Sequence, residues 1–304
     1  MMNPHSGIVG GWRREDKEPS RAEKLSTSPN YSEIRTAVSK YLPSINNNIE
    51  SDLRKFSPSL RHDQLNTSTC SVNAMTRALE NKRIQHAYSD AIAQGKSEAD
   101  ALALAQLSHI QLSRLALYFL AREEMDPPET DKDAGTIISI VAELLHLFGV
   151  ARETPNGPDD RAYWPFDTSK VCVSPTWLSM RDSSLHKISG WFRITSNGND
   201  RVDDVIANLA VGNPVVFGTE VGANFTQYNG GVIQPVNGLI QGGHATMLCG
   251  WDPSGFFWDE NSWGNNWGYD GFAKVAPEVI ASSDSSDFIV ITSGWEPWLP
   301  KEQI

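Results

Sequence analysis

The sequence is poor in cysteine, in basic charge and in long apolar runs, and each shortage excludes a class of protein. Its 304 residues include three cysteines, Cys70, Cys172 and Cys249, so a small secreted fold held by several disulfides is excluded. The 26 Lys and Arg stand against 37 Asp and Glu, a net charge of −11, which opposes binding to nucleic-acid phosphates. The longest nearly apolar stretch, residues 136–150, is shorter than the roughly 20 residues of a membrane span. We therefore expect neither nucleic acid nor membrane as a partner.

The N-terminal region also lacks a readable secretory signal. Residues 1–14 contain no apolar segment of the roughly 7 to 15 residues that such a signal needs. The compartment stays unknown, with cytoplasm or export by a signal-independent route both open. Residues 1–48 are polar, with one weakly amphipathic stretch at 31–38, and we interpret them as an N-terminal extension to a single domain over residues 49–304.

The residue composition and the apolar pattern of the remaining chain change near its middle. Apolar spacing predicts a helix from Cys70 to about Gly95, a second from Ser97 to about Arg122, and a third over residues 136–148. Later, Pro, Gly and aromatic residues alternate with short β-branched runs, which predicts a helix at 202–211 and strands at 214–219, 244–251, 256–260, 271–275 and 288–292. The pattern indicates an α+β fold with its helical half first.

Three residues carry a pattern of chemistry. Cys70 lies where a loop runs into a predicted helix, and a helix N-terminus favours a thiolate, although a lone cysteine can equally be a small buried hydrophobe. His244 lies in an apolar strand with glycines before it, and Asn261 lies at the end of the next strand. Together they supply a nucleophile, a base and a group that orients the base, as thiol-dependent acyl transfer requires.

The order of these motifs resembles that of the papain-like (C1-type) cysteine peptidases. Gln64 ahead of Cys70, then Gly243-His244-Ala245, then the run Asn-Ser-Trp-Gly-Asn-Asn-Trp-Gly at 261–268 are the residues that carry the resemblance. Shorter segments at 52–54, 113–118, 133–135, 163–167 and 212–216 are similar to bacterial-type members. The resemblance covers residues 50–295 and implies a two-lobed papain-like fold, with an N-terminal helical lobe, a C-terminal β-barrel-like lobe and the active site between them.

The resemblance also implies a role for each residue. Cys70 would be the nucleophile, His244 its base and later its acid, and Asn261 the residue that orients the imidazole. Gln64 would donate its side-chain N–H, with the backbone N–H of Cys70, to the oxyanion of the tetrahedral intermediate. The chain would then be an endopeptidase acting on protein or peptide substrates.

Two further positions are candidate substrate-binding residues. Gly135 falls where the family uses a glycine to let the substrate backbone approach as an extended strand. Trp263 would also cover the hydrogen bond between Asn261 and His244 and keep water from it. The seven histidines show no metal-ligand spacing, so we expect no metal and no cofactor.

The sequence departs from the family pattern at the loop before the nucleophile. Leu65 and Ser68 stand where glycines are usual, and a Cβ at a position with positive φ costs about 1 kcal/mol. This leaves two alternatives to a peptidase: a weak or inactive homologue that only binds peptides, or a thiol acyltransferase of effector type with the same triad.

The regions that flank the motifs add two hypotheses. The segment 81–106 is longer than usual and reads as an extended helical hairpin on the surface. The run Gly-Gly-Trp-Arg-Arg at 10–14 resembles the lead-in of bacterial members, in which such an extension often blocks the cleft. We therefore expect residues 1–48 to be inhibitory or only partly ordered.

Overall fold

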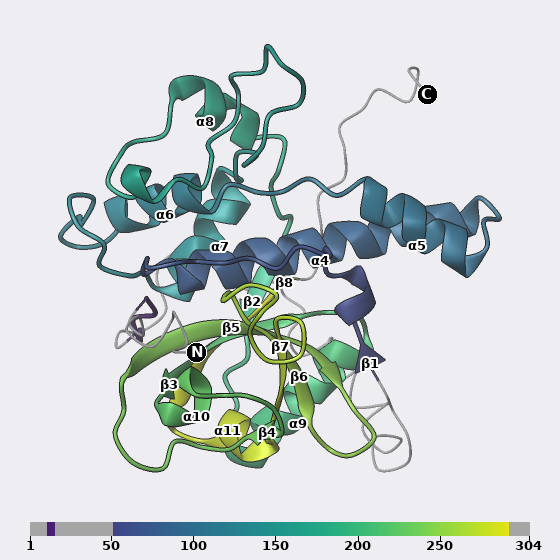
Figure 1. Cartoon of the computed structure of the whole chain (residues 1–304), viewed down its shortest axis with the longest axis vertical. Coiled ribbons are helices and arrows are strands. Elements are labelled where there is room, and N and C mark those ends of the chain that lie inside the picture. The colour runs from purple at the N-terminus through teal and green to yellow at the C-terminus, as the bar shows by residue number, and fades with distance from the viewer. Residues whose placement is uncertain (1–10, 16–50, 292–304) are drawn as a thin grey trace.

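The computed structural model describes residues 11–15 and 51–291, and these form a helical half and a sheet half that meet along one long helix (Figure 1). The helical half contains α4 (Cys70–Ala93), α6 (Arg114–Glu123), α7 (Ile138–Leu147), α8 (Trp177–Ser183) and the 3₁₀ turn η2 (Thr168–Lys170). Helix α5 (Glu98–Leu107) pairs with the far end of α4 and projects to the side. The sheet half carries α9 (Gly198–Ala210), α10 (Ala223–Thr226) and α11 (Pro277–Ala281), and η1 (Arg54–Phe56) leads toward α4.

Helix α4 is the element that joins the two halves. Residues 70–81 along its first half are all buried, because α6 and α7 contact it from the helical half and strands β5 and β3 from the sheet half. A helix buried on all sides needs no polar face, so the buried residues of α4 surround the helix instead of forming a single stripe. The N-terminus of α4 consequently lies at the boundary between the halves.

Within the described residues the sheet has eight strands in the order β2-β8-β3-β5-β6-β7-β4, with β1 paired to β5. The strands are β1 (Ser51–Asp52), β2 (Trp191–Arg193), β3 (Val215–Val221), β4 (Val232–Ile233), β5 (Gly242–Trp251), β6 (Phe257–Glu260), β7 (Phe272–Val275) and β8 (Ser285–Ile291). All described pairings are antiparallel except β4 with β7. The α+β class is therefore confirmed, but the sheet is open, and only loosely matches the expected barrel-like lobe.

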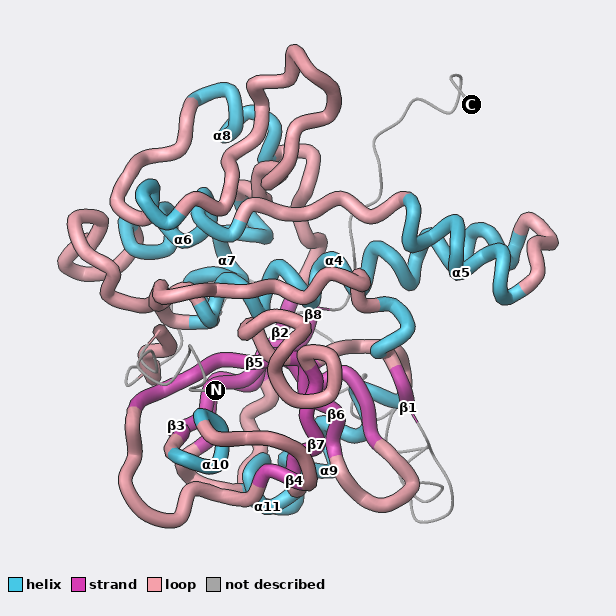
Figure 2. The backbone as a smooth tube through the Cα atoms, in the orientation of Figure 1, coloured by secondary structure: helices cyan, strands magenta, loops and turns pink. Residues whose placement is uncertain are grey.

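The five strands expected from the sequence are confirmed within a few residues. The strands that sequence reasoning missed, β1, β2 and β4, have two or three residues each. Figure 2 shows the strands gathered in one half, whereas the helices of the other half are joined by long loops. Within the described residues, no helix is both long and apolar enough to cross a bilayer.

The prediction of one continuous helix from Ser97 to about Arg122 is wrong. The chain leaves the helix after Leu107 and starts another at Arg114, although no proline lies between them. The backbone N–H of Leu112 donates to the buried carboxylate of Glu80 at 2.9 Å, and Ser113 caps α6 with its hydroxyl. A contact with α4 and a cap together end the helix where local spacing alone would continue it.

Candidate active site

Cys70 is the first residue of α4, at the helix start that the sequence predicted. Its side chain is fully buried. All three cysteines are free thiols; Cys172 is exposed and Cys249 is buried in β5. Helix α4 packs on β5, and the backbone N–H of Ala245, the residue after His244, favours the anion of Cys70 and so lowers its pKa. The thiol of α4 therefore lies against the strand that carries the expected base.

The His244 imidazole is held by Asn261. Nε2 of His244 lies 2.8 Å from Oδ1 of Asn261, and because an amide oxygen only accepts, Nε2 carries the proton. Asn261 is itself fixed, since its backbone N–H donates to the Gly271 carbonyl at 3.0 Å and its side-chain Oδ1 also accepts from the Ser262 backbone N–H at 2.7 Å. This leaves Nδ1 as the nitrogen able to take a proton from a nucleophile.

Aromatic side chains enclose that pair in what we call the imidazole cage, formed by Trp263, Trp267 and Phe225. The Trp263 ring stacks on the His244 ring with centroids 4.8 Å apart and an interplanar angle of 30°. Trp267 meets Trp263 edge-on at 5.6 Å, and Phe225 meets His244 edge-on at 6.4 Å. Trp263 thus stacks on the His244 ring, while its cover of the His244–Asn261 hydrogen bond and its contact with substrate stay predictions.

Gln64 is buried and fixed in orientation beside the nucleophile. Its Oε1 accepts from the Ser262 hydroxyl at 2.7 Å, and its backbone N–H donates to the Ser262 carbonyl at 2.8 Å. Its Nε2 donates to the Thr67 carbonyl at 2.8 Å, which leaves the second N–H of the same amide for an oxyanion. The loop before Cys70 is thereby tied to the residue that follows Asn261.

The two replaced glycines differ in their consequences. Leu65 adopts a φ of 51°, so its Cβ carries the left-handed penalty of about 1 kcal/mol. Ser68 is not in that region; its N–H donates to both carboxylate oxygens of Asp133, at 3.0 and 2.9 Å. The loop therefore keeps its hydrogen bonds in spite of the substitutions.

Thr136, a residue that sequence reasoning missed, pairs through its main chain with residues 11–13. The Thr136 N–H donates to the Gly11 carbonyl at 2.9 Å, and the Thr136 carbonyl accepts from the Arg13 N–H at 3.1 Å. Gly135 precedes it with a φ of 76°, and its N–H donates to the Tyr118 hydroxyl at 2.9 Å. The glycine thus sets the turn, and its role toward substrate stays a prediction.

Residues 11–15, which we call the strap, cover the nucleophile. A Cβ on Gly11 would lie 2.8 Å from the Cys70 sulfur and 2.5 Å from the Ser68 carbonyl oxygen, so only glycine fits there. Beyond it, Trp12 is buried and donates from its indole to Asp287 at 2.9 Å. The rest of the predicted extension, including the stretch at 31–38, lies outside the described residues.

The covered thiol differs from the sequence expectation of a thiolate. Burial raises the pKa of Cys70 to about 12, and hydrogen bonds from the Ala245 N–H and from Ser71 offset only part of this. Because no water reaches the sulfur, the anion is poorly solvated and the helix N-terminus does not compensate. In this arrangement Cys70 is a neutral thiol, and ionisation requires that the strap move.

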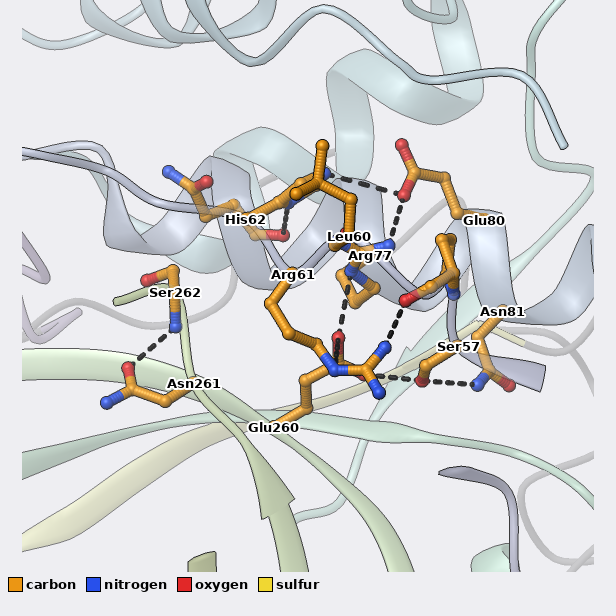
Figure 3. Close-up of polar contacts among 12 residues, drawn as sticks. Ser57, Leu60, Arg61, His62, Arg77, Glu80, Asn81, Glu260, Asn261 and Ser262 are labelled. Atoms are coloured by element: carbon orange, nitrogen blue, oxygen red, sulfur yellow. Dashed lines mark hydrogen bonds and ion pairs between the residues drawn. The ribbon is translucent and has the colours of Figure 1, made fainter. Parts of the chain in front are cut away.

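A buried ionic cluster lies next to Asn261 (Figure 3). Arg77 of α4 contacts Glu80 at 2.9 Å and Glu260 at 3.0 Å, and Glu260 is the residue before Asn261. His62 lies 3.4 Å from Glu80 and bonds the Asn73 carbonyl through Nδ1 at 3.3 Å. The cluster fastens the Cys70 helix to the Asn261 strand, and its scattered members gave no local sequence signal.

Burial also decides the charges in this cluster. Burial and the neighbouring Arg77 lower the pKa of His62 to about 3, so the ring is neutral at ordinary pH. Burial alone would raise the pKa of Glu80, but the Arg77 guanidinium beside it holds that pKa well below its usual range. A cavity of about 620 Å³ adjoins the cluster and does not reach Cys70; its lining includes Pro58, Leu60, His62, Arg77, Gln106 and His109.

Comparisons with known proteins agree with this arrangement. Residues 152–289 match the sequence model of the papain family cysteine proteases. An uncharacterized peptidase C1-like protein of Acanthamoeba polyphaga mimivirus is 27% identical over 196 residues, which cover 61% of this chain and 60% of that protein. Cathepsin B-like cysteine proteinase 6 of Caenorhabditis elegans is 37% identical over 79 residues, which cover 25% of this chain and 21% of that protein. The matches thus span 60% or less of these relatives' own length.

Solved structures extend the likeness to the whole fold. Xylellain, a cysteine protease from Xylella fastidiosa, has a TM-score of 0.65 at 24% identity, covering 94% of this chain and 97% of that one. Digestive procathepsin L2 from the Tenebrio molitor larval midgut has a TM-score of 0.60 at 16% identity, covering 95% and 79%. The described fold is therefore papain-like, and the segment that matches the papain family cysteine proteases, residues 152–289, includes His244 and Asn261.

Proposed function

We propose that the protein is a cysteine peptidase that hydrolyses peptide bonds through a thioester on Cys70. The observation that carries this proposal is the 2.8 Å bond from His244 to Asn261, held beside a cysteine at a helix N-terminus. Gln64, tied to the residue after Asn261, supplies the further donor that acyl transfer needs. The family match and the cathepsin B-like relatives support the same activity.

The reaction requires an open cleft and proceeds in two halves. Cys70 gives its proton to Nδ1 of His244, and the sulfur attacks the substrate carbonyl carbon, whose oxygen accepts from Gln64 and from the Cys70 N–H. The carbon–nitrogen bond breaks as His244 protonates the leaving amine, which leaves the thioester. His244 then takes a proton from water, the hydroxide attacks the thioester, and the acid and the thiol are released.

We further propose that the strap inhibits this activity. Gly11 lies over the sulfur, and residues 11–13 fill the pairing edge of Thr136 that an extended peptide would use. Two of the solved structures with a similar fold are procathepsins, which are proforms. In this proposal residues 1–48 form an inhibitory extension and residues 49–304 the peptidase domain.

The two alternatives are less well supported. An inactive peptide-binding homologue would follow from a distorted loop before Cys70, yet the Gln64 side chain keeps both of its partners there. A thiol acyltransferase would use the same three residues, so only its products distinguish it. The peptidase fits the family model without a further assumption.

Covalent labelling of the full chain tests the activity. We expect an epoxide or vinyl-sulfone peptide probe to label Cys70, slowly in the full chain and faster after Trp12→Ala loosens the strap. Cys70→Ala is the control, because it leaves Cys172 and Cys249 in place. Labelling that persists in Cys70→Ala, or that never occurs on Cys70 in either chain, would contradict the peptidase.

Product analysis tests the acyl acceptor. The Trp12→Ala protein is incubated with a peptide ester or amide and an added amine, and the products are separated by mass. We expect hydrolysis to dominate. Amide formation that outruns hydrolysis at millimolar amine would show an acyltransferase instead.

A further inference from the structure

Asp133 accepts hydrogen bonds from the loop before the nucleophile and from the turn that precedes Thr136. Both of its carboxylate oxygens accept from the Ser68 backbone N–H, at 3.0 and 2.9 Å, and Oδ1 also accepts from the Tyr118 hydroxyl. That hydroxyl in turn accepts from the Gly135 backbone N–H at 2.9 Å. One carboxylate therefore joins two segments that the proposed reaction uses.

The peptide unit between Thr67 and Ser68 links Asp133 to Gln64. Its N–H donates to Asp133, and its carbonyl oxygen accepts from Nε2 of Gln64 at 2.8 Å. Because a peptide unit is planar, fixing its N–H also fixes the direction of its carbonyl. A charged acceptor holds the N–H more strongly than a neutral one. The Asp133 carboxylate thereby fixes the carbonyl to which the Gln64 amide donates.

The orientation of that amide decides where its second N–H points. Oε1 of Gln64 accepts from the Ser262 hydroxyl at 2.7 Å, and Nε2 donates one N–H to the Thr67 carbonyl. The remaining N–H is the donor that the proposed reaction directs at the oxyanion. If the Thr67 carbonyl turned away, the amide would lose one of its two side-chain contacts, and this donor would be less well placed in the transition state.

Tyr118 carries the second branch, which leads to Thr136. The Tyr118 side chain is fully buried, and the Arg122 guanidinium lies 4.1 Å from its ring centroid. Burial and then the Asp133 carboxylate raise the pKa of Tyr118, so the hydroxyl keeps its proton and donates it to the carboxylate. The same hydroxyl holds the N–H of Gly135, which has a φ of 76°. It thus fixes the turn from which the main chain of Thr136 extends.

Asp133 itself is exposed, which separates a positioning role from a purely structural one. Hydrogen bonds to an exposed carboxylate replace bonds to water, so their net contribution to stability is small. Removal of this side chain should therefore change the placing of the groups around it more than the free energy of unfolding.

We propose that Asp133 is a positioning residue of this peptidase, which orients the Gln64 amide through the Thr67–Ser68 peptide and holds the turn before Thr136 through Tyr118. The inference rests on the proposed function and deepens it. One branch acts on the donor to the oxyanion and so on kcat, because that contact forms in the transition state. The other acts on the residue whose main chain an extended substrate would use, and so on KM.

The catalytic test uses full-length Trp12→Ala as the parent, because its strap is loosened, and a fluorogenic peptide amide. We expect Asp133→Ala to lower kcat about ten-fold, less than the loss of an oxyanion donor itself, with the urea midpoint unchanged. Asp131→Ala is the matched control, at an exposed aspartate two residues away, and should leave kcat unchanged. Asp133→Asn keeps an oxygen acceptor and should restore part of kcat.

A double-mutant cycle shows whether Asp133 acts through Gln64. In the Gln64→Ala background, Asp133→Ala should lower kcat by less than about two-fold, because the donor that it positions is gone. Tyr118→Phe breaks only the second branch, so it should raise KM about three-fold with little change in kcat. An equal loss of kcat from Asp133→Ala in both backgrounds would overturn the inference, and so would a loss of kcat in Tyr118→Phe as large as that in Asp133→Ala.

A spectroscopic test keeps the inference falsifiable if no peptide is cleaved. The side-chain amide signals of Gln64 in the magnetic resonance spectrum of the full chain are identified by their loss in Gln64→Ala. We expect Asp133→Ala to shift these signals and to speed their exchange with solvent about five-fold, because the Thr67 acceptor is no longer held. Asp131→Ala should leave them in place. Unchanged Gln64 signals in Asp133→Ala would overturn the inference, whereas shifted signals in a protein without turnover would contradict only the peptidase.

Discussion

The imidazole cage and the strap lie on neighbouring sides of Cys70 and are held by different forces. The cage packs Trp263 and Trp267 around a buried hydrogen bond, within a stretch of the same lobe. The strap is held by two backbone hydrogen bonds to Thr136, by one buried indole, by a half-exposed ion pair of Arg13 and by a largely buried ion pair of Glu15. An exposed ion pair contributes only about 0–1 kcal/mol, so we expect the Arg13 end of the strap to be its weaker attachment.

The residues of the proposed triad are therefore held in place, whereas the access of solvent to them is limited by the strap. His244 and Asn261 keep their bond and Gln64 keeps its partners in the covered state. In that state burial raises the pKa of Cys70. Variants on the fixed side should have larger effects on stability, and variants of the strap should change the access to Cys70.

The largest expected effect comes from the ionic cluster behind the cage. Arg77→Met removes the partner of both Glu80 and Glu260, which are buried, and should lower the free energy of unfolding by about 3–5 kcal/mol. Urea denaturation measures this. Arg161→Met, at an exposed arginine, is the matched control, and equal losses in the two variants would show that the cluster does not fasten α4 to β6.

The next effect concerns the cover itself. Gly11→Ala places a Cβ against the Cys70 sulfur and the Ser68 carbonyl, so the strap should leave the cleft. Iodoacetamide should then alkylate Cys70 at least ten-fold faster at neutral pH, because a solvated thiol regains its ordinary pKa near 8.5. Arg14→Ala, at an exposed strap residue, should change the rate much less; an unaltered rate in Gly11→Ala would mean that the strap does not cover the thiol in solution.

Alkaline pH should open the same cover. The covered Cys70 has its pKa raised to about 12, so the neutral thiol stabilises the covered form. That contribution is complete below the ordinary thiol pKa and is lost as pH rises from there toward 12. The emission of Trp12, taken as the difference from Trp12→Phe, should shift to the red above about pH 9. The shift should be absent in Cys70→Ala, and its persistence there would assign it to another group.

A smaller effect is expected from the rim of the strap. Arg13 forms an ion pair with Glu129, and its own side chain is 41% exposed, so Arg13→Gln should weaken the cover by less than about 1 kcal/mol. Alkylation of Cys70 should therefore rise by a few-fold, and added salt should raise the wild-type rate toward that of the variant. A wild-type rate that does not respond to salt would argue that the ion pair contributes nothing.

The smallest effect tests the loop on the fixed side. Leu65→Gly removes a Cβ from a residue with φ of 51° and should raise the free energy of unfolding by about 0.5–1 kcal/mol. Leu60→Gly is the control, because Leu60 is more exposed and has no positive φ. Equal losses in both variants would show that Leu65 is not strained.

Much of the site was predictable because its signals are local. The run at 261–268 and the glycine-preceded His244 mark their chemistry within a few residues, and the structure brings these two together as expected. The sequence predicted strain in this loop if Leu65 or Ser68 adopts a positive φ. Leu65 does adopt one, whereas Ser68 does not. The helix break before Arg114 was not predictable, because it depends on Glu80, a residue of another helix.

The sequence by itself determined the order of the two halves and indicated the proposed nucleophile, base and orienting residues, because residue type and spacing along the chain carry that information. Only the tertiary structure decided that Thr136 pairs with the strap, that Gly11 covers the sulfur and that Asp287 accepts from Trp12. Trp12 and Asp287 lie 275 residues apart in the chain, and a contact over such a separation leaves no periodic or local pattern to read. The proposed chemistry of the site is thus local in sequence, while its cover is a product of the fold.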